Sequence, residues 1–556
     1  MSSARTSDLW WKNAVIYCLD IETFLDTTGD GCGDVNGVTE RIDYLAGIGV
    51  SCIWLMPFYP SPNRDDGYDI TDFYAVDPRL GSLGDVVALI RTANDRGMRV
   101  IIDLVVNHTS DRHPWFKSSR RSRTSPHRDW YVWRDEPSAE PHAEVVFPDA
   151  EDSIWTKDDK TGQYYLHHFY SHQPDLNIAN PAVREEVAKI AGFWLELGVS
   201  GFRVDAVPFL IETGGIGAKV DLEPHDFLKD LRAFMSRRRG DSVLLGEVNL
   251  PPKPLRAFFG DAQGDELQVL FGFPVMQAMY LALARRDARP LAKALRRSPV
   301  IPPDSQWATF VRNHDELTLD QLSDSERQEV FAAFGPDPEM QLFGRGLRRR
   351  LPPMLDADQD RIRLVYSLLF SLPGTPVLFY GEEIGMGENL DVEGRMSVRT
   401  PMQWTDSLSG GFSHARGAKL RRPLSGGRFG PLAVNVAQQR RDPDSLLNWM
   451  ERIIRRRKET PEFGWGSVTV LDTSEATVLA HRCDWEGRSV LAVHNFADEP
   501  RIVTITVDFQ DGTTLIDLLD SGAGLESLTA GSLELQLEAY GYRWFRAQQQ
   551  QSPEAP

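Results

Sequence analysis

The sequence predicts an α/β protein: a (β/α)8 TIM barrel with an inserted domain after the third strand and a C-terminal antiparallel β-sandwich domain. Three observations favour this fold. Eight apolar, β-branched segments alternate with amphipathic ones, one long interval interrupts the alternation, and beyond residue 466 the pattern changes to short strands separated by turns. At 556 residues the chain also exceeds what one hydrophobic core usually organises, so more than one domain is expected.

Eight segments have the composition of buried parallel strands. They are NAVIYCL near residue 13, VSCIWLM near 50, MRVIIDLVV near 98, VSGFRVDAV near 199, SVLLGEV near 242, ELQVLFGF near 266, QWATFV near 306 and GTPVLFY near 374. Amphipathic segments such as VREEVAKIAGFWLEL separate them, as crossover helices do. Eight such units favour a closed barrel over an open doubly wound sheet.

Two intervals in this alternation are too long for one helix and its loops. About 90 residues separate the third and fourth strands, and a second insertion is expected from about 318 to 358. Both insertions follow the C-terminal end of a strand. In such barrels the C-terminal ends of the strands form the catalytic face, so both insertions are expected to line a pocket. The predicted domains are 1–106 and 186–465 for the barrel, 107–185 for the inserted domain, 466–546 for the β domain and 547–556 for a disordered polar tail.

The composition excludes several classes of protein. A net charge of −19 with a pI near 5.2 disfavours binding to nucleic acid and to anionic membranes, and the basic segment KSSRRSR at 117–123 is interpreted as a solvated loop. No apolar run is long enough to span a bilayer, and no secretory signal or nucleotide-binding glycine motif is found. A soluble, cytoplasmic protein without an organic cofactor is expected, and the sequence leaves open whether it forms homo-oligomers.

The four cysteines are scattered and have no CxxC spacing. This distribution indicates buried thiols in a reducing compartment rather than a disulfide framework or a zinc site. The residues are Cys18, Cys32, Cys52 and Cys483.

Acidic residues stand where four of the predicted barrel strands meet their loops: Asp103, Asp205, Glu247 and Asp315. Clustered like charges are costly without a function, so their shared position at one mouth points to catalysis. Two carboxyls about 5 to 5.5 Å apart suffice for retaining glycoside chemistry, one as nucleophile and one as acid/base. Arg203 lies two residues before Asp205 on the same strand face, where its charge keeps a nucleophile ionised.

The motifs around these residues resemble the conserved blocks of the α-amylase superfamily. DLVVNH, GFRVDAV, GEVN and RNHDE occur in the family's order, and QPDLN at 173–177 resembles the additional block of its oligo-1,6-glucosidase branch. HPWF, QYYLHHFYSHQPDLN, RNHDELTL and VRTPMQW are similar to the trehalose synthase group within that branch and to its hydrolytic relatives. The resemblance covers nearly the whole chain.

The resemblance implies a role for each site residue. Asp205 would be the nucleophile, Glu247 the acid/base and Asp315 the residue that binds ring hydroxyls and stabilises the transition state. The first sugar subsite would be completed by Asp103, His108, Arg203, His314 and the aromatic platform Tyr68. Asp65 with Arg399 would close the pocket behind the non-reducing end, which implies exo action on small α-glucosides such as maltose, trehalose and short maltooligosaccharides.

The segment DTTGDGCGD at 26–34 alternates acidic residues with glycines, a spacing that lets oxygens converge on a hard cation. It resembles the calcium loop that follows the first strand in this branch, although Thr28 stands where the family usually has Asn. A structural Ca²⁺ is therefore expected. The predicted ligands are Asp26, Thr28, Asp30, Asp34 and the carbonyl of Cys32.

Departures from the trehalose synthase pattern leave the fate of the glucosyl unit open. Glu22 and Thr23 replace the usual basic residue and Ser before Phe24, and Met396 replaces the acidic residue that usually follows Arg395. Glucosyl transfer, including maltose–trehalose interconversion, ranks ahead of hydrolysis of short α-1,4-glucosides by an exo-acting α-glucosidase. A non-catalytic, transporter-associated subunit is a third reading, which the retained carboxylates and the lack of a membrane segment disfavour.

Overall fold

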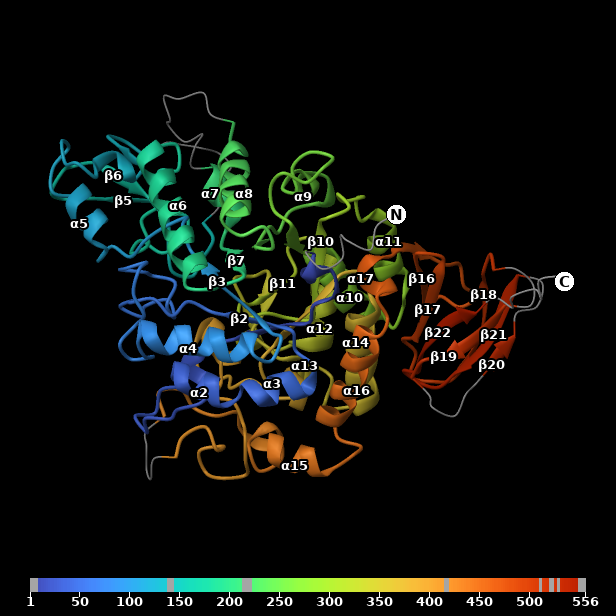
Figure 1. The fold of residues 1–556 in the computed structure, drawn as a ribbon. Helices are drawn as coiled ribbons and strands as arrows, with labels where there is room; N and C mark the ends of the chain where they lie inside the picture. Colours follow the sequence, from blue (N-terminus) through green and yellow to red (C-terminus); the bar gives the residue numbers. More distant parts are fainter. Residues whose placement is uncertain are drawn as a thin grey trace.

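Eight parallel strands close into a barrel, which lies between the inserted segments and the C-terminal strands (Figure 1). The computed structural model describes residues 9–137, 145–212, 223–414, 420–509, 513–519, 525–527 and 531–548. Strands that are neighbours in the barrel are also consecutive among the barrel strands along the chain, and each pair is parallel. The predicted barrel is therefore confirmed.

All eight predicted segments supply a barrel strand, and nearly every residue in these strands is buried. The strands are β1 (Ile16–Leu19), β2 (Cys52–Leu55), β3 (Arg99–Leu104), β7 (Gly201–Val204), β8 (Val243–Gly246), β9 (Val269–Phe271), β10 (Gln306–Phe310) and β14 (Thr375–Phe379). At the start of β7, Gly201 has φ +150°, and a Cβ there would lie 2.1 Å from the carbonyl oxygen of Val243. Only glycine lets β7 approach β8 this closely.

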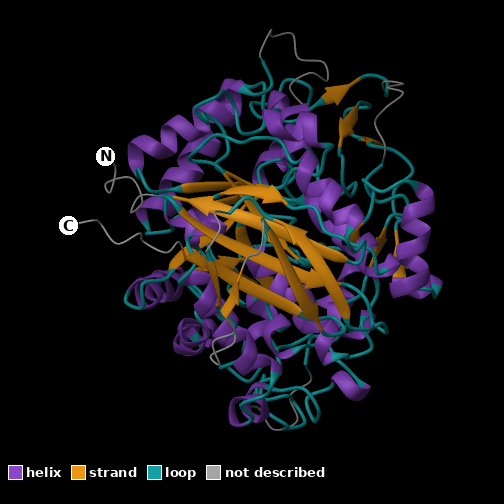
Figure 2. Ribbon diagram, turned by 90° about the vertical axis from the view of Figure 1, so that its right-hand side faces the viewer, coloured by secondary structure: helices purple, strands orange, loops and turns teal. Residues whose placement is uncertain are grey.

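Helices follow the barrel strands along the chain. Figure 2, seen from the side of the C-terminal domain, shows helices around the strands. Local signals set where they begin: Ser82 and Asp85 form a capping box at the start of α4, and Asn180 caps α6, whose first residue is Pro181. The helices are α1 (Ile21–Phe24), α2 (Val35–Glu40), α3 (Ile42–Ile48), α4 (Leu83–Asn94), α6 (Pro181–Glu196), α7 (Val207–Glu212), α8 (Asp226–Arg238), α9 (Pro252–Ala257), α10 (Phe273–Arg285), α11 (Arg289–Arg297), α12 (Asp324–Phe334), α13 (Leu351–Met354), α14 (Gln359–Ser371), α15 (Val436–Arg441), α16 (Leu446–Lys458) and α17 (Glu462–Trp465).

The inserted domain lies between β3 and α6, at the opposite end of the molecule from the C-terminal domain (Figure 1). It contains α5 (Pro114–Ser119) and a small antiparallel sheet of β4 (Trp133–Arg134), β6 (Tyr164–Leu166) and β5 (Trp155–Lys157). Its own apolar cluster consists of Val132, Ile154, Trp155 and Leu166.

The second insertion contains α12 and a three-stranded antiparallel sheet. This sheet has the order β11 (Leu317–Thr318), β13 (Gly346–Leu347) and β12 (Gln341–Leu342). The hairpin that joins β12 to β13 turns at residues 343–345.

Two antiparallel sheets form the C-terminal domain. One has the order β15 (Ser467–Val470), β16 (Val478–Trp485), β17 (Arg488–Asn495), β22 (Tyr542–Gln548), β19 (Thr514–Asp517) and β20 (Leu525–Ser527); the other pairs β18 (Arg501–Thr506) with β21 (Ser532–Leu537). Apolar residues of both sheets, such as Leu491 and Val503, share one core, as in a sandwich. Residues 547 and 548 of the predicted tail belong to β22, and 549–556 lie outside the described residues.

The prediction of buried thiols is confirmed, since all four cysteine side chains are buried and free. Among the helices of the described ranges, none is both long enough and apolar enough to cross a membrane.

Candidate active site

The carboxyl ends of β3, β7, β8 and the loop after β10 bring the four predicted acids to one mouth of the barrel. Asp103 is the fifth residue of β3, while Asp205 and Glu247 directly follow the last residues of β7 and β8. The register of β3 and β7 pairs Asp103 with Arg203. The barrel topology, which joins strands distant in sequence, thus assembles the cluster.

The buried guanidinium of Arg203 joins three of these acids. Its Nη1 lies 2.7 Å from Oδ1 of Asp103 and contacts Oδ1 of Asp205, and its Nη2 lies 2.9 Å from Oε2 of Glu247. Arg203 also lies over the ring of Trp54, whose Nε1 donates a 2.7 Å hydrogen bond to Asp103. One cation therefore offsets the repulsion among three carboxylates and fixes their relative positions.

The two predicted catalytic carboxyls experience different environments. Burial raises the pKa of Glu247 to about 7; Arg203 opposes this shift, and the charges of Asp205 and Asp315 add to it. Near neutral pH Glu247 is therefore able both to donate and to accept a proton. Asp205 contacts the guanidinium of Arg203 directly.

A strained backbone connects these carboxyls. Ala206, directly after Asp205, has φ +50°, an uncommon conformation for a residue other than glycine. Its N–H donates a 3.1 Å hydrogen bond to Oε2 of Glu247. The strained turn thus directs the N–H of Ala206, which follows Asp205, toward the carboxylate of Glu247. Backbone strain of this kind is often retained at functional sites.

Asp315 lies among cations and a histidine. Its Oδ2 is 3.0 Å from Nε2 of His314, and its Oδ1 accepts hydrogen bonds of 2.5 Å from Nη1 of Arg395 and 3.1 Å from Nη2 of Arg399. Burial acts to raise the pKa of Asp315, but His314 and the two arginines together hold it well below its usual range. Asp315 is therefore an ionised acceptor, suited to binding sugar hydroxyls.

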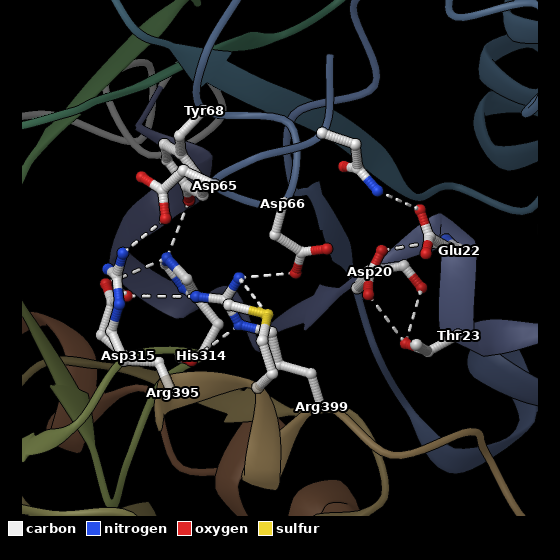
Figure 3. A network of polar contacts seen from close by, with 12 residues as sticks. Asp20, Glu22, Thr23, Asp65, Asp66, Tyr68, His314, Asp315, Arg395 and Arg399 are labelled. Atoms are coloured by element: carbon white, nitrogen blue, oxygen red, sulfur yellow. Dashed lines mark hydrogen bonds and ion pairs between the residues drawn. The ribbon is translucent and has the colours of Figure 1, made fainter. Parts of the chain in front are cut away.

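Tyr68 and His314 form one wall beside Asp315 (Figure 3). The tyrosine hydroxyl is 2.7 Å from Nε2 of His314, and the two rings are stacked with centroids 5.5 Å apart. Burial lowers the pKa of His314 to about 4, so its ring is neutral at neutral pH. His108, also predicted for this subsite, is buried with Nε2 3.2 Å from the carbonyl oxygen of Tyr68.

The predicted pairing of Asp65 with Arg399 is wrong, because Asp65 pairs with Arg395 instead. Nη2 of Arg395 lies 2.6 Å from Oδ1 of Asp65, while Nη1 of Arg399 lies 2.6 Å from Oδ2 of Asp66 (Figure 3). Both arginines reach Asp315, so Arg395 directly bridges Asp65 to Asp315. The two arginines are four residues apart around a 3-10 turn at Gly394–Val398, and the sequence alone does not show which one faces Asp65.

Besides Arg395, three residues of this network are not among the predicted site residues: Asp66, Gln173 and Arg422. Asp66 also contacts Arg422, and Gln173 of the QPDLN block donates a 2.8 Å hydrogen bond to Asp65. The signal for Asp66 was its position beside Asp65 in the acidic doublet of RDDGYD. Arg422 carried no signal, because it lies more than 350 residues along the chain from its partner.

The negative charge of Glu22, where the chain departs from the trehalose synthase pattern, is neutralised by cations within the structure. Oε2 of Glu22 lies 3.1 Å from Nη1 of Arg79 and 3.2 Å from Nδ2 of Asn63, and Oε1 lies 3.8 Å from Nε of Arg422. Figure 3 shows Glu22 on the far side of Asp20 and Asp66 from Asp315. The charge at this position therefore binds local arginines rather than facing the carboxylate cluster.

The 26–34 loop uses its carboxylates within the chain. Asp26 accepts hydrogen bonds from the N–H groups of Gly29 and Gly31, and Asp34 accepts from those of Thr27 and Gly37. Asp30 is exposed and accepts from the N–H of Cys32. Across the described part of the chain, no group of three or more His, Cys, Asp or Glu side chains is arranged to hold a metal ion. The three predicted carboxylates, Asp26, Asp30 and Asp34, are not such a group in this arrangement.

Comparison with known proteins agrees with the fold. The family profile described as alpha amylase, catalytic domain, matches residues 19–331 and 348–466, and that of the sucrose hydrolase-like C-terminal domain matches residues 487–546. The chain therefore belongs to the α-amylase family, and it is an enzyme of that family with the fold predicted from its sequence.

Several curated relatives are similar over nearly the whole chain. The trehalose synthase/amylase TreS of Mycolicibacterium smegmatis is 41% identical over 97% of this chain and 93% of the relative. The trehalose synthase of Pimelobacter sp. is 40% identical over 97% of this chain and 96% of the relative. Among solved structures, the trehalulose synthase MutB from Pseudomonas mesoacidophila is 29% identical, with a TM-score of 0.76 over 97% of this chain and 99% of that one.

Proposed function

We propose that the enzyme transfers a glucosyl unit within small α-glucosides and interconverts maltose and trehalose. The observation that carries the proposal is the identity of 40 to 42% with trehalose synthases along nearly all of this chain. Oligo-1,6-glucosidase of Halalkalibacterium halodurans is more distant, at 29% identity. The arrangement of carboxylates on Arg203 supports the same chemistry and argues against a non-catalytic subunit.

In the proposed first step, Asp205 attacks the anomeric carbon of the non-reducing glucose. Glu247, protonated by virtue of its raised pKa, gives its proton to the glycosidic oxygen, and the second glucose leaves. A β-glucosyl ester on Asp205 results, so the mechanism is retaining. Arg203 contacts both carboxyls and so holds them in one geometry through this step.

In the second step, ionised Glu247 takes a proton from an acceptor hydroxyl, and the acceptor oxygen attacks the anomeric carbon to release Asp205. When the acceptor is the O1 hydroxyl of the released glucose, the product is trehalose. When the acceptor is water, the product is glucose. Asp315, held ionised by His314 and Arg395, binds ring hydroxyls in both steps.

Incubating the purified enzyme with maltose and following the products by chromatography tests the proposal. Trehalose with little free glucose is the expected result. Glucose as the sole product would establish the exo-α-glucosidase alternative, which shares the same intermediate and differs only in its acceptor.

We further propose that the enzyme works in a reducing, cytoplasmic compartment and that the 26–34 loop binds calcium. The four buried, unpaired cysteines support the first proposal. Three carboxylates within nine residues support the second, because a carboxylate that accepts amide hydrogen bonds retains further lone pairs for a cation. Recovering the activity from a cytoplasmic fraction tests the location.

A further inference from the structure

Arg422 is not among the predicted subsite residues, but it belongs to a chain of charges that ends at Asp315. Its Nη2 contacts Oδ1 of Asp66, and its Nε lies 3.8 Å from Oε1 of Glu22. Nη1 of Arg399 lies 2.6 Å from the other oxygen of Asp66, and its Nη2 lies 3.1 Å from Oδ1 of Asp315 (Figure 3). Two arginines therefore share the carboxylate of Asp66, and one of them also reaches Asp315.

Asp66 carries its charge in a buried position. Its side chain is only 3% exposed. The charged and titratable groups that face it are Arg422, Arg399, His314 and the neighbouring carboxyl of Asp20. Burial acts to raise the pKa of Asp66, but Arg422 and then Arg399 hold it below its usual range. A buried carboxylate stays ionised only while it is paired, so these two arginines together keep Asp66 charged.

The guanidinium of Arg399 is held at three points. Its Nε donates a 2.9 Å hydrogen bond to the carbonyl oxygen of His314, while its two Nη atoms bind Asp66 and Asp315. The carbonyl is neutral, so Asp66 is the charged anchor that balances the pull of Asp315. The direction in which Arg399 faces Asp315 therefore depends on the charge of Asp66.

The segment at 420–426 that carries Arg422 is fixed against the segment that carries Arg399. The hydroxyls of Ser425 and Thr400 lie 3.1 Å apart, both residues are buried, and Thr400 directly follows Arg399. The side chain of Arg422 is itself only 13% exposed. Arg422 therefore reaches its carboxylate partner from a fixed direction, unlike a freely moving arginine on the surface.

We propose that Arg422 is a positioning residue for the reaction at Asp315, where it acts through Asp66 to hold Arg399 in place. The inference rests on the proposed function in one respect, namely that Asp315 binds the sugar during turnover of maltose. Without Arg422, Asp66 keeps one compensating arginine and takes up a proton at a higher pH. Protonated Asp66 no longer offers Arg399 a charged anchor, so Asp315 loses a correctly placed partner.

The test compares the pH profiles of kcat/KM for the wild type and Arg422→Gln, measured as loss of maltose. A nearby opposite charge lowers the pKa of a carboxyl by about 1 to 3 units, so the pKa of Asp66 is expected to rise by about one unit or more in this variant. The acidic limb of the profile is expected to move to higher pH by a similar amount. Arg422→Lys keeps the charge and is expected to retain a limb close to that of the wild type. Circular dichroism and the melting temperature check that each variant is folded.

Arg79→Gln is the matched control, because Arg79 also binds Glu22 but is not part of the route to Asp315. Nη1 of Arg79 lies 3.1 Å from Oε2 of Glu22, and its Nη2 lies 2.8 Å from Asp77. This variant is expected to leave the acidic limb unchanged. Equal movement of the limb in Arg79→Gln and Arg422→Gln would reflect a general loss of positive charge and would overturn the inference.

Asp66→Asn gives a test that does not require Arg422→Gln to fold. This variant removes the titrating carboxyl, so kcat/KM is expected to fall about tenfold at every pH while the acidic limb stays at its wild-type position. The double variant Arg422→Gln/Asp66→Asn leaves no unpaired carboxylate at this position. It is expected to match Asp66→Asn in both properties, because Arg422 then has no partner through which to act. A further loss of kcat/KM in the folded double variant would show a different route and contradict the inference.

Measuring the loss of maltose keeps the two proposals distinguishable. Glucose as the only wild-type product would overturn the proposed interconversion, while the pH profiles would still decide the inference, because both acceptors react at the same site. Trehalose from the wild type, together with an unmoved acidic limb in folded Arg422→Gln, would overturn the inference alone.

Discussion

Nη2 of Arg203 lies 2.9 Å from Oε2 of Glu247, and the opposite arm of the same guanidinium binds Asp205. This contact opposes the effect of burial, which raises the pKa of Glu247. A carboxyl held between these influences titrates near neutral pH rather than remaining permanently charged or permanently neutral. The geometry therefore gives the site a group that is able to transfer a proton in both directions.

The pH dependence of kcat/KM for maltose follows from this pKa. A general acid is active when protonated, so activity is expected below the Glu247 pKa of about 7 and to fall as the pH rises through that value. Burial raises the pKa of Asp103 to about 7 as well, so the free enzyme titrates as a coupled cluster. Asp103→Asn, although less active, is expected to keep the basic limb. Loss of that limb in Asp103→Asn would assign the titration to Asp103.

Substitution of each carboxyl tests the two catalytic roles. Asp205→Asn and Glu247→Gln are each expected to lower kcat about 10⁴-fold or more, because each removes an interaction made in the transition state. Circular dichroism and the melting temperature check that the fold is intact. A substrate with a good leaving group needs little protonation, so it is expected to restore formation of the glucosyl ester in Glu247→Gln but not in Asp205→Asn. Rescue of both variants, or of neither, would contradict this assignment.

The barrel was predictable because its strands are buried on both sides and carry their signal locally. IYCL of β1 and CIWL of β2 are fully buried, and runs of this kind alternate with amphipathic helices along the sequence. The acids at the strand ends follow from the same signal, since parallel strands present their carboxyl ends at one mouth.

Pairings between loops were not predictable in this way. Arg395 and Arg399 have the same charge and lie one turn apart, and only the path of the 394–398 turn decides which of them faces Asp65. The contact of Phe147 with Phe343 depends on how two insertions are placed over the barrel, and no periodicity in either segment encodes that placement.

Replacement of Arg395 tests its bridge between Asp65 and Asp315. Arg395→Gln is expected to lower kcat/KM about 100-fold, because two carboxylates lose the charge that compensates them. Arg395 helps to hold the pKa of Asp315 low, so this pKa is expected to rise in the variant. Since Asp315 acts in its ionised form, the acidic limb of the pH profile moves to higher pH. Arg395→Lys, which keeps the charge, is expected to shift that limb less, and equal shifts in the two variants would refute the electrostatic explanation.

Chelation tests the proposed calcium ion in the 26–34 loop. A ligand that binds only the folded state stabilises it by about 2.7 kcal/mol at 100 times its Kd, so EDTA is expected to lower the melting temperature and added calcium to restore it. In Asp30→Ala, which removes an exposed predicted ligand, the chelator is expected to have no effect. No bound calcium by metal analysis, with equal melting temperatures with and without EDTA, would eliminate the site.

The last prediction concerns the length of the substrate. Asp65, Arg395 and Asp315 form a continuous bridge at 2.6 Å and 2.5 Å, which we infer closes the pocket behind the non-reducing glucose. Burial raises the pKa of Asp65, and the charge of Arg395 opposes this rise. Neither water nor a sugar hydroxyl replaces one partner of this buried ion pair without a cost in free energy. Maltose is therefore expected to react far faster than amylose, and the products of longer chains are expected to arise from their non-reducing ends. Asp65→Ala removes one end of the bridge and is expected to narrow the difference between maltose and maltoheptaose, chiefly through a higher KM for maltose. Rapid internal cleavage of amylose by the wild type, seen as an early fall in viscosity, would show that the bridge does not close the pocket.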